Sequence, residues 1–188
     1  MFKEKEMLIT NKYLKQFSPI PLNYNLDEVN NYVGVAELIW IRPIIGDDFY
    51  DELCTQVEED SLTEANQTLF LEALYPYLAY AVCLEALPFI WADMNEKGIT
   101  LNRSENSESV TLKDMTYLEG HLRRQVEARK DFFINYLDTH LESFPLYDEF
   151  KNCGCNGGTD GCCSNAKLNK PNPLYRVWST KRINTSLR

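Results

Sequence analysis

The feature that most constrains the fold is a run over residues 78–87 in which nearly every side chain is apolar. A helix that is apolar around its whole circumference must be covered on most sides. The run belongs to a longer helical pattern, expected over about residues 62–95, that Gly98 can end. Pro76 and Pro88 each remove one backbone hydrogen bond, so a kink or break is predicted at each. We therefore expect other helices to pack around this central one.

Helices predicted in the N-terminal third of the chain are expected to pack against part of this central helix. A short helix is expected over residues 11–17. Asn25 is a good N-cap, and Glu28 follows three residues later as in a capping box. The apolar residues after it have helical spacing. Pro43 and Gly46 are expected to close this helix.

The sequence predicts the starts of three further helices. Asp47 opens a second helix, where the helix dipole favours an anion. Ser61 with Glu64 forms a capping box for the central helix. A last long helix is expected over about residues 113–143, ended by Pro145. Its predicted core stripe has spacings of mostly three and four: Met115, Leu118, Leu122, Val126, Phe133, Leu137 and Leu141.

Between the two long helices, residues 99–101 and 109–112 are short β-branched runs. They predict a small hairpin or flap over about residues 99–112, with a disordered loop as the alternative. The predicted fold class is therefore all-α: a helical bundle of about four main helices, with a short β-hairpin or flap and an extended C-terminal arm. No run approaches 18 apolar residues, so no membrane-spanning helix is expected.

Acidic and basic residues are distributed unevenly along the chain. All 28 acidic residues lie at or before Asp160, and the 22 residues from 167 to 188 carry a charge of +6 within a total of −9. We predict a helical core over residues 1–152 and a Cys-rich hinge with a basic arm over residues 153–188. The arm can lie on the acidic surface of a neighbour. Its candidate docking residues are Tyr175, Arg176, Trp178, Lys181 and Arg182.

The hinge holds four of the six cysteines, Cys153, Cys155, Cys162 and Cys163. Four thiolates can close a tetrahedral zinc site, although the spacing is C-x-C and C-C rather than the usual C-x₂-C. Disulfides formed after release from the cell and free thiols in a mobile hinge are the alternatives. The start of the sequence lacks the apolar stretch of a signal peptide, so synthesis in the cytoplasm, where thiols stay reduced, is expected.

No catalytic constellation stands out, and the chain is not expected to be an enzyme. His121 and His140 form no metal-binding motif and are interpreted as surface or packing residues. Neither has a Glu three residues earlier, as a bundle di-iron site requires. Cys54 and Cys83 lie in apolar stretches and are interpreted as buried. No cofactor is expected apart from a possible zinc ion.

Residues 33–53, VGVAELIWIRPIIGDDFYDEL, resemble the head–tail connector (adaptor) proteins of tailed bacteriophages, in particular those of Bacteroides phages and crAss-like phages. In those proteins a helix ends in a Pro–Gly turn and a second helix opens with a tyrosine and a leucine facing the core. The resemblance covers about residues 7–145. The matching residues are Ala36, Ile41, Pro43, Ile44, Gly46, Phe49, Tyr50, Asp51, Glu52 and Leu53.

The resemblance implies a virion structural protein made in the cytoplasm of a bacterial host. Such a protein forms a ring of identical subunits, commonly a dodecamer, at the neck of the virion. The ring lies below the portal protein, extends the DNA channel and supports a further neck or tail ring protein. DNA is then only the channel's contents, and no membrane is involved. The rival hypothesis is a small zinc-binding regulatory protein that uses the Cys cluster and the basic tail to bind nucleic acid.

Overall fold

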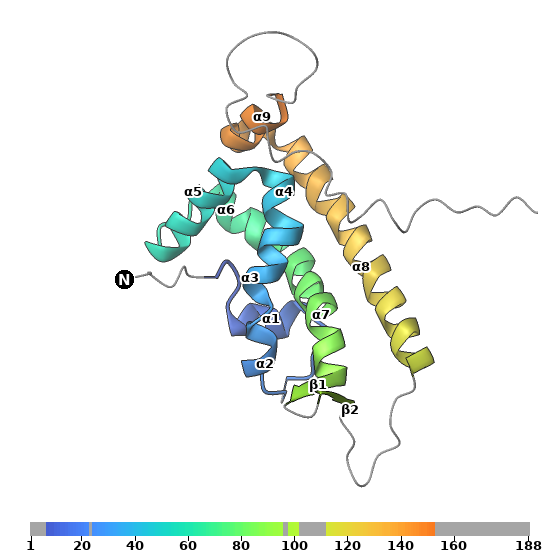
Figure 1. Cartoon of the computed structure of the whole chain (residues 1–188). Helices are drawn as coiled ribbons and strands as arrows, with labels where there is room; N and C mark the ends of the chain where they lie inside the picture. The colour runs from blue at the N-terminus through green and yellow to red at the C-terminus, as the bar shows by residue number, and fades with distance from the viewer. Residues whose placement is uncertain (1–6, 23, 96–97, 102–111, 153–188) are drawn as a thin grey trace, which may run out of the picture. The chain divides into compact units, whose positions relative to one another are not determined.

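A computed structural model of the chain describes residues 7–22, 24–95, 98–101 and 112–152 (Figure 1). The described residues are mostly helical, which confirms the all-α class. The chain divides into two units, Met1–Phe150 and Lys151–Arg188. The description below concerns the first unit.

The N-terminal half is a series of short helical elements that ends in a longer helix. One of them, η1, is a π-helical turn. The elements are α1 (Asn11–Phe17), α2 (Asp27–Asn30), α3 (Val33–Ala36), η1 (Glu37–Ile41), α4 (Arg42–Ile45) and α5 (Asp47–Glu58).

The C-terminal half contains the two long helices, a second π-helical turn (η2) and a 3₁₀ turn (η3). A two-stranded antiparallel sheet follows the first long helix. The elements are α6 (Glu64–Leu69), η2 (Phe70–Leu74), α7 (Tyr75–Trp91), β1 (Ala92–Asn95), β2 (Gly98–Leu101), α8 (Leu112–Thr139), η3 (Leu141–Ser143) and α9 (Pro145–Asn152).

Helix α7 is the central helix, as its apolar circumference predicts. It packs against α8 on one side and against α1, α2 and α3 on others. Tyr77, Leu78 and Val82 are fully buried. The Tyr77 ring lies 5.6 Å from that of Phe133 on α8, measured between centroids. The core of the unit is thus centred on the segment that the sequence singles out.

Three prolines lie within helices rather than breaking them. The helix that Pro43 and Gly46 are expected to close passes through Pro43 and ends at Ile45, directly before Gly46. Pro76 and Pro88 lie within continuous helix. A π-helical turn ends two residues before Pro43 and another two residues before Pro76. There the N–H of the residue before the proline bonds five residues back, to Glu37 and Phe70 respectively. The wider turn makes room where the proline has no N–H and would crowd the preceding turn.

The hairpin predicted over about residues 99–112 is not confirmed. Strand β2 contains residues 99–101 as expected, but its partner is β1, not residues 109–112. Helix α7 therefore ends at Trp91 rather than near Asn95. Residues 109–111 lie outside the described ranges, and Leu112 begins α8. The local pairing needs a much shorter loop than the predicted one, and loop closure costs more as loops lengthen.

Several helix ends differ from their predicted positions. The helix expected to run on from Asn25 is interrupted after Asn30, because consecutive asparagines favour turns over helix. Thr63, not Ser61, caps α6, since its side chain accepts from the Asn66 N–H at 3.2 Å. Helix α8 ends at Thr139, before the 3₁₀ turn η3, rather than at Pro145. Pro145 instead begins α9, at the first helical position that proline favours.

Among the described residues, one continuous helical segment, Glu64–Ile90, is long and apolar enough to cross a membrane by length and composition alone. Of its most apolar stretch, 61% is buried inside the unit, as in the core helix of a soluble protein.

Candidate assembly surface

Gly46 forms the turn between α4 and α5 and has a backbone conformation that only glycine adopts readily. Its φ is +84° and its ψ is 164°. A Cβ at this position would lie 2.6 Å from a ring carbon of Phe150 on α9. The turn therefore fixes the direction of α5 and receives the aromatic ring of α9 at the same point.

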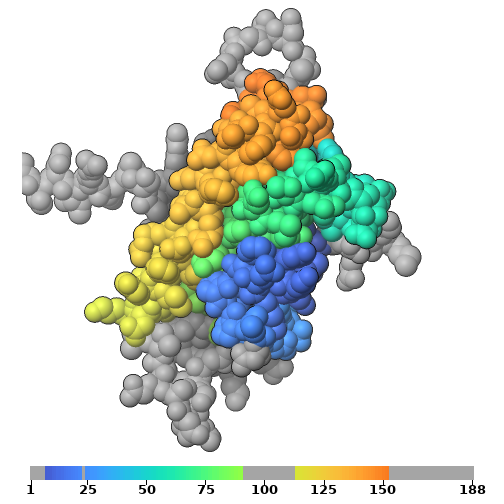
Figure 2. All heavy atoms as spheres, turned by 180° about the vertical axis from the view of Figure 1, so that it is seen from behind, coloured from blue at the N-terminus to red at the C-terminus, as the bar shows by residue number. Residues whose placement is uncertain are grey.

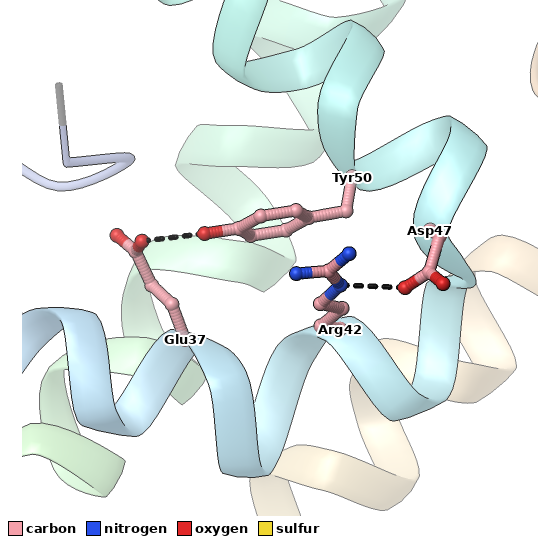
Figure 3. Close-up of polar contacts among 4 residues, drawn as sticks. All are labelled: Glu37, Arg42, Asp47 and Tyr50. Atoms are coloured by element: carbon pink, nitrogen blue, oxygen red, sulfur yellow. Dashed lines mark hydrogen bonds and ion pairs between the residues drawn. The ribbon is translucent and has the colours of Figure 1, made fainter. Parts of the chain in front are cut away.

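The buried carboxylate of Glu37, near this turn, forms hydrogen bonds with two other segments of the chain, and Figure 3 shows the one with Tyr50. Glu37 in η1 is 3% exposed. One of its oxygens accepts from the Leu8 N–H at 2.7 Å and the other from the Tyr50 hydroxyl at 2.9 Å. A buried carboxylate is tolerated when donors meet its oxygens. Glu37 thus joins the N-terminal segment, η1 and α5.

Arg42 lies on the solvent side of the same turn. Its Nε donates to Asp47 at 2.5 Å, and its guanidinium lies 5.5 Å from the Tyr50 ring centroid (Figure 3). Burial, and then the nearby charge of Glu37, raises the pKa of Tyr50 well above its ordinary value. Tyr50 is therefore a neutral hydrogen-bond donor at physiological pH. These contacts hold α4 and α5 in a fixed relation.

A second pair of contacts attaches η1 to α7. The Trp40 indole donates to Glu85 at 2.9 Å, and the Tyr77 hydroxyl donates to the Trp40 carbonyl at 3.0 Å. The second bond joins α7 directly to the backbone of η1, three residues before Pro43. The inner side of η1 is therefore fully engaged with the core.

The outer side of α3 and η1 is apolar and uncovered. Val35, Leu38 and Ile39 are 40%, 53% and 40% exposed. They are spaced at i, i+3 and i+4, so they share one face of the helix. We call this set the α3–η1 face. The same helix therefore has apolar residues on both its buried and its exposed side.

Helix α8 shows a similar arrangement. Tyr117, Leu118 and Phe132 are 74%, 43% and 54% exposed. Leu118 and Phe132 are about four helical turns apart and lie on the same side. We call these three residues the α8 face. Leu118 is thus wrongly placed in the predicted core stripe, whereas Met115, Leu122, Val126, Phe133 and Leu137 are buried as predicted.

The two faces belong to helices on different sides of α7. Both α3 and α8 pack on α7 (Figure 1). Helices α8 and α5 lie at opposite edges of the unit, as the view from behind also shows (Figure 2).

Charge differs between these two edges. From residue 43 to residue 96 the sequence has 12 acidic residues and no Lys or Arg. Helix α5 and the segment after it carry most of the exposed ones: Asp47, Asp48, Asp51, Glu58, Glu59, Asp60 and Glu64. Helix α8 is net neutral instead, because its five basic residues are balanced by five acidic ones: Lys113, Arg123, Arg124, Arg129 and Lys130 against Asp114, Glu119, Glu127, Asp131 and Asp138.

The described residues offer little for catalysis or metal binding. Within the described ranges, no group of three His, Cys, Asp or Glu side chains is placed to hold a metal ion. Cys54 and Cys83 are buried, as predicted, and burial raises the pKa of the Cys83 thiol to about 12. His121 is exposed, and His140 stacks on Tyr136 at 4.4 Å between centroids, so both are surface or packing residues.

The predicted hinge and arm sites lie outside the described residues. They comprise the candidate metal ligands Cys153, Cys155, Cys162 and Cys163, and the docking residues Tyr175, Arg176, Trp178, Lys181 and Arg182. Tyr50 and Leu53, predicted to face the core, are 3% and 0% exposed. Sequence reasoning did not single out Glu37. The sequence feature that could have identified it is its position, four residues after Val33 and therefore on the buried face of an apolar helix.

Comparison with known proteins identifies a family. A family of unknown function, DUF6712, matches residues 41–157, and the chain belongs to it. The match includes the Pro43–Gly46 turn, α5, the central helix and α8. No curated protein matches the chain, and no solved structure does.

Proposed function

We propose that this member of the DUF6712 family is a structural protein of a phage virion and not an enzyme. In this proposal it is a head–tail connector. Identical subunits form a ring, most simply a dodecamer, below the portal protein in the neck. The ring extends the DNA channel, joins the capsid to the tail, and contacts a further neck or tail ring protein.

The observation that carries the proposal is the uncovered apolar surface on two sides of one small unit. Leu38 and Phe132 are each more than half exposed, on helices whose other sides are packed in the core. Exposed apolar residues gathered on one short helix face, as Val35, Leu38 and Ile39 are, mark interaction surfaces. A subunit with two such faces can contact two neighbours at once, as every subunit of a ring does.

The residues behind the resemblance to connector proteins also support it. Gly46 has the positive φ of a tight turn, and Tyr50 and Leu53 lie in the core beneath it. These residues shape the fold, so the resemblance concerns the geometry between α4 and α5 rather than a surface motif. A related turn in the same place favours a related helical subunit.

The charge of the protein suits a channel ring. A surface rich in carboxylates repels DNA phosphates within a Debye length of about 8–10 Å. DNA in transit is then not held by the wall. The proposed architecture is a bundle of about four main helical segments. The hairpin and the C-terminal arm add contacts between subunits and to the portal.

Electron microscopy of the purified protein, with and without a portal, tests the proposal. Rings of uniform diameter that attach to the portal are expected. Removal of residues 153–188 should leave a folded helical core that assembles less well. A monodisperse monomer indifferent to the portal would refute the connector function. If that monomer also bound zinc, and bound DNA through its tail, the rival regulatory function would replace it.

A further inference from the structure

We propose that α9 is a hinged lid on the turn between α4 and α5, and that it opens as a unit while the rest of the core stays folded. The inference goes beyond the proposed function and does not rest on it, because the opening is a property of a single subunit. When the lid opens, residues 145–152 are added to the predicted C-terminal arm, which begins at residue 153.

The lid is held closed from one side. Leu146, Tyr147 and Phe150 pack against the core, whereas Glu149 is exposed. Tyr147 is 4% exposed, and its hydroxyl donates to a carboxylate oxygen of Asp138 on α8 at 2.9 Å. The closed position of α9 therefore depends on one helix face.

Phe150 closes the lid over a residue that has no side chain. A Cβ on Gly46 would lie 2.6 Å from a ring carbon of Phe150, so the ring occupies the space that another residue would fill (Figure 1 shows α9 beside this turn). The φ of Gly46, +84°, favours glycine at the same position. Phe150 is only half-buried, so this contact lies at the margin of the core.

The connection between α8 and α9 supplies the hinge. Helix α8 ends at Thr139, and the 3₁₀ turn η3 separates it from α9. His140 and Phe144, on either side of η3, have non-helical ψ values of 32° and 69°. Hinges are commonly a few residues at the ends of such elements. Phe144 is 1% exposed, and its ring lies 5.7 Å from that of Phe49 between centroids, so the chain stays anchored directly before the lid.

Helix α9 is too short to be stable by itself. It has eight residues, and isolated helices of that length are marginal in water. Its helical form therefore depends on the contacts of Leu146, Tyr147 and Phe150, and we expect undocking and unwinding to occur together. A segment with few buried contacts opens at a lower free energy than the core.

Opening changes the length of chain that follows the hinge. As a helix, residues 145–152 span about 12 Å, and fully extended they span about 26 Å. Opening also uncovers the Gly46 turn, which directs α5. The lid thus links the reach of the C-terminal segment to the exposure of this turn.

Hydrogen exchange of the full-length chain, resolved to single amides by mass spectrometry, tests the proposal. Amides of residues 148–152 are compared with those of α7 over a series of urea concentrations below the unfolding transition. Phe150→Ala removes the ring that closes the lid. Glu149→Ala, on the exposed side of α9, is the matched control. Each protein is measured at two concentrations, so that protection from assembly is recognised.

The amides of residues 148–152 are expected to share one protection factor, at least about tenfold below that of α7, which urea hardly changes because local opening exposes little surface. Phe150→Ala should lower their protection by about a further tenfold, since a half-buried ring is lost, and leave α7 unchanged. The control should exchange like the wild type.

Three outcomes would overturn the proposal. Protection that falls gradually towards Asn152 would show fraying of a helix end instead of a lid. Equal protection and equal urea dependence in α9 and α7 would make α9 part of the cooperative core. Unchanged exchange of α9 in Phe150→Ala would mean that the ring over Gly46 does not hold the lid closed.

Discussion

Replacing Gly46 with alanine tests the turn that directs α5. At φ +84° and ψ 164° an alanine costs about 1–3 kcal/mol in backbone strain. Its Cβ would also lie 2.6 Å from Cδ2 and 2.7 Å from Cγ of Phe150, closer than real contacts allow. Overpacking of this kind costs about 1–3 kcal/mol. Phe150 is half-buried and its ring can shift, so we expect a total loss of about 2–4 kcal/mol.

Urea denaturation followed by far-UV circular dichroism measures this loss. With a slope of about 2 kcal/mol/M, the midpoint should fall by roughly 1–2 M. The measurement is made at two protein concentrations, so that a contribution from assembly is recognised. A second measurement in the Phe150→Ala background removes the clash and should leave only the backbone strain.

Gly34→Ala is the matched control. Gly34 lies in α3, and a Cβ there would meet nothing within 4 Å. The same substitution should therefore stabilise the protein, by about 0.5–1 kcal/mol, because alanine favours helix. If alanine at position 46 were tolerated as well as alanine at position 34, the assigned conformation of the turn would be wrong.

Three further predictions concern the core. Tyr50→Phe should lower the free energy of unfolding by about 1–3 kcal/mol, because the buried carboxylate loses a donor; an unchanged urea midpoint would contradict this. Burial raises the pKa of Cys83 from 9.0, and that of Tyr75 from 10.0, to about 12. Both groups stay neutral in the fold to a higher pH than in the unfolded chain. The free energy of unfolding should therefore be at its full value below pH 9 and decline as the pH rises towards 12; an unchanged free energy of unfolding over that range in urea titrations would contradict this. Arg129→Gln should cost about 0.5–2 kcal/mol, since its guanidinium lies 3.7 Å from the Tyr80 ring centroid; a thermal melt unchanged from wild type would refute this.

The elements set by local chemistry are those that the sequence predicts well. The bounds of α1 and the start of α5 at Asp47 match the expectation. The central position of α7 follows from its apolar circumference. In each case neighbouring residues are enough to decide the structure.

The prolines show what local sequence does not predict. Proline chemistry predicts a lost hydrogen bond, but not how the surrounding turn adjusts. Here a π-helical turn before Pro43 and another before Pro76 absorb the defect. A tertiary contact reaches the first of these turns, because Tyr77 donates to the Trp40 carbonyl. Such a contact joins residues far apart in the sequence, so a local pattern does not reveal it.

The exposed apolar faces were the hardest feature to predict, and the reason is physical. In α3 and η1 apolar residues occupy both sides of the helix, and hydrophobicity alone assigns all of them to the core. The structure covers one side only: Ile41 is fully buried, whereas Leu38 is 53% exposed. The apolar pattern suggests burial on both sides of the helix, but only one side is buried within the chain. If the other side is covered by another copy, a glutamate at position 38 should cost assembly and leave folding intact, whereas at position 41 it should destroy both.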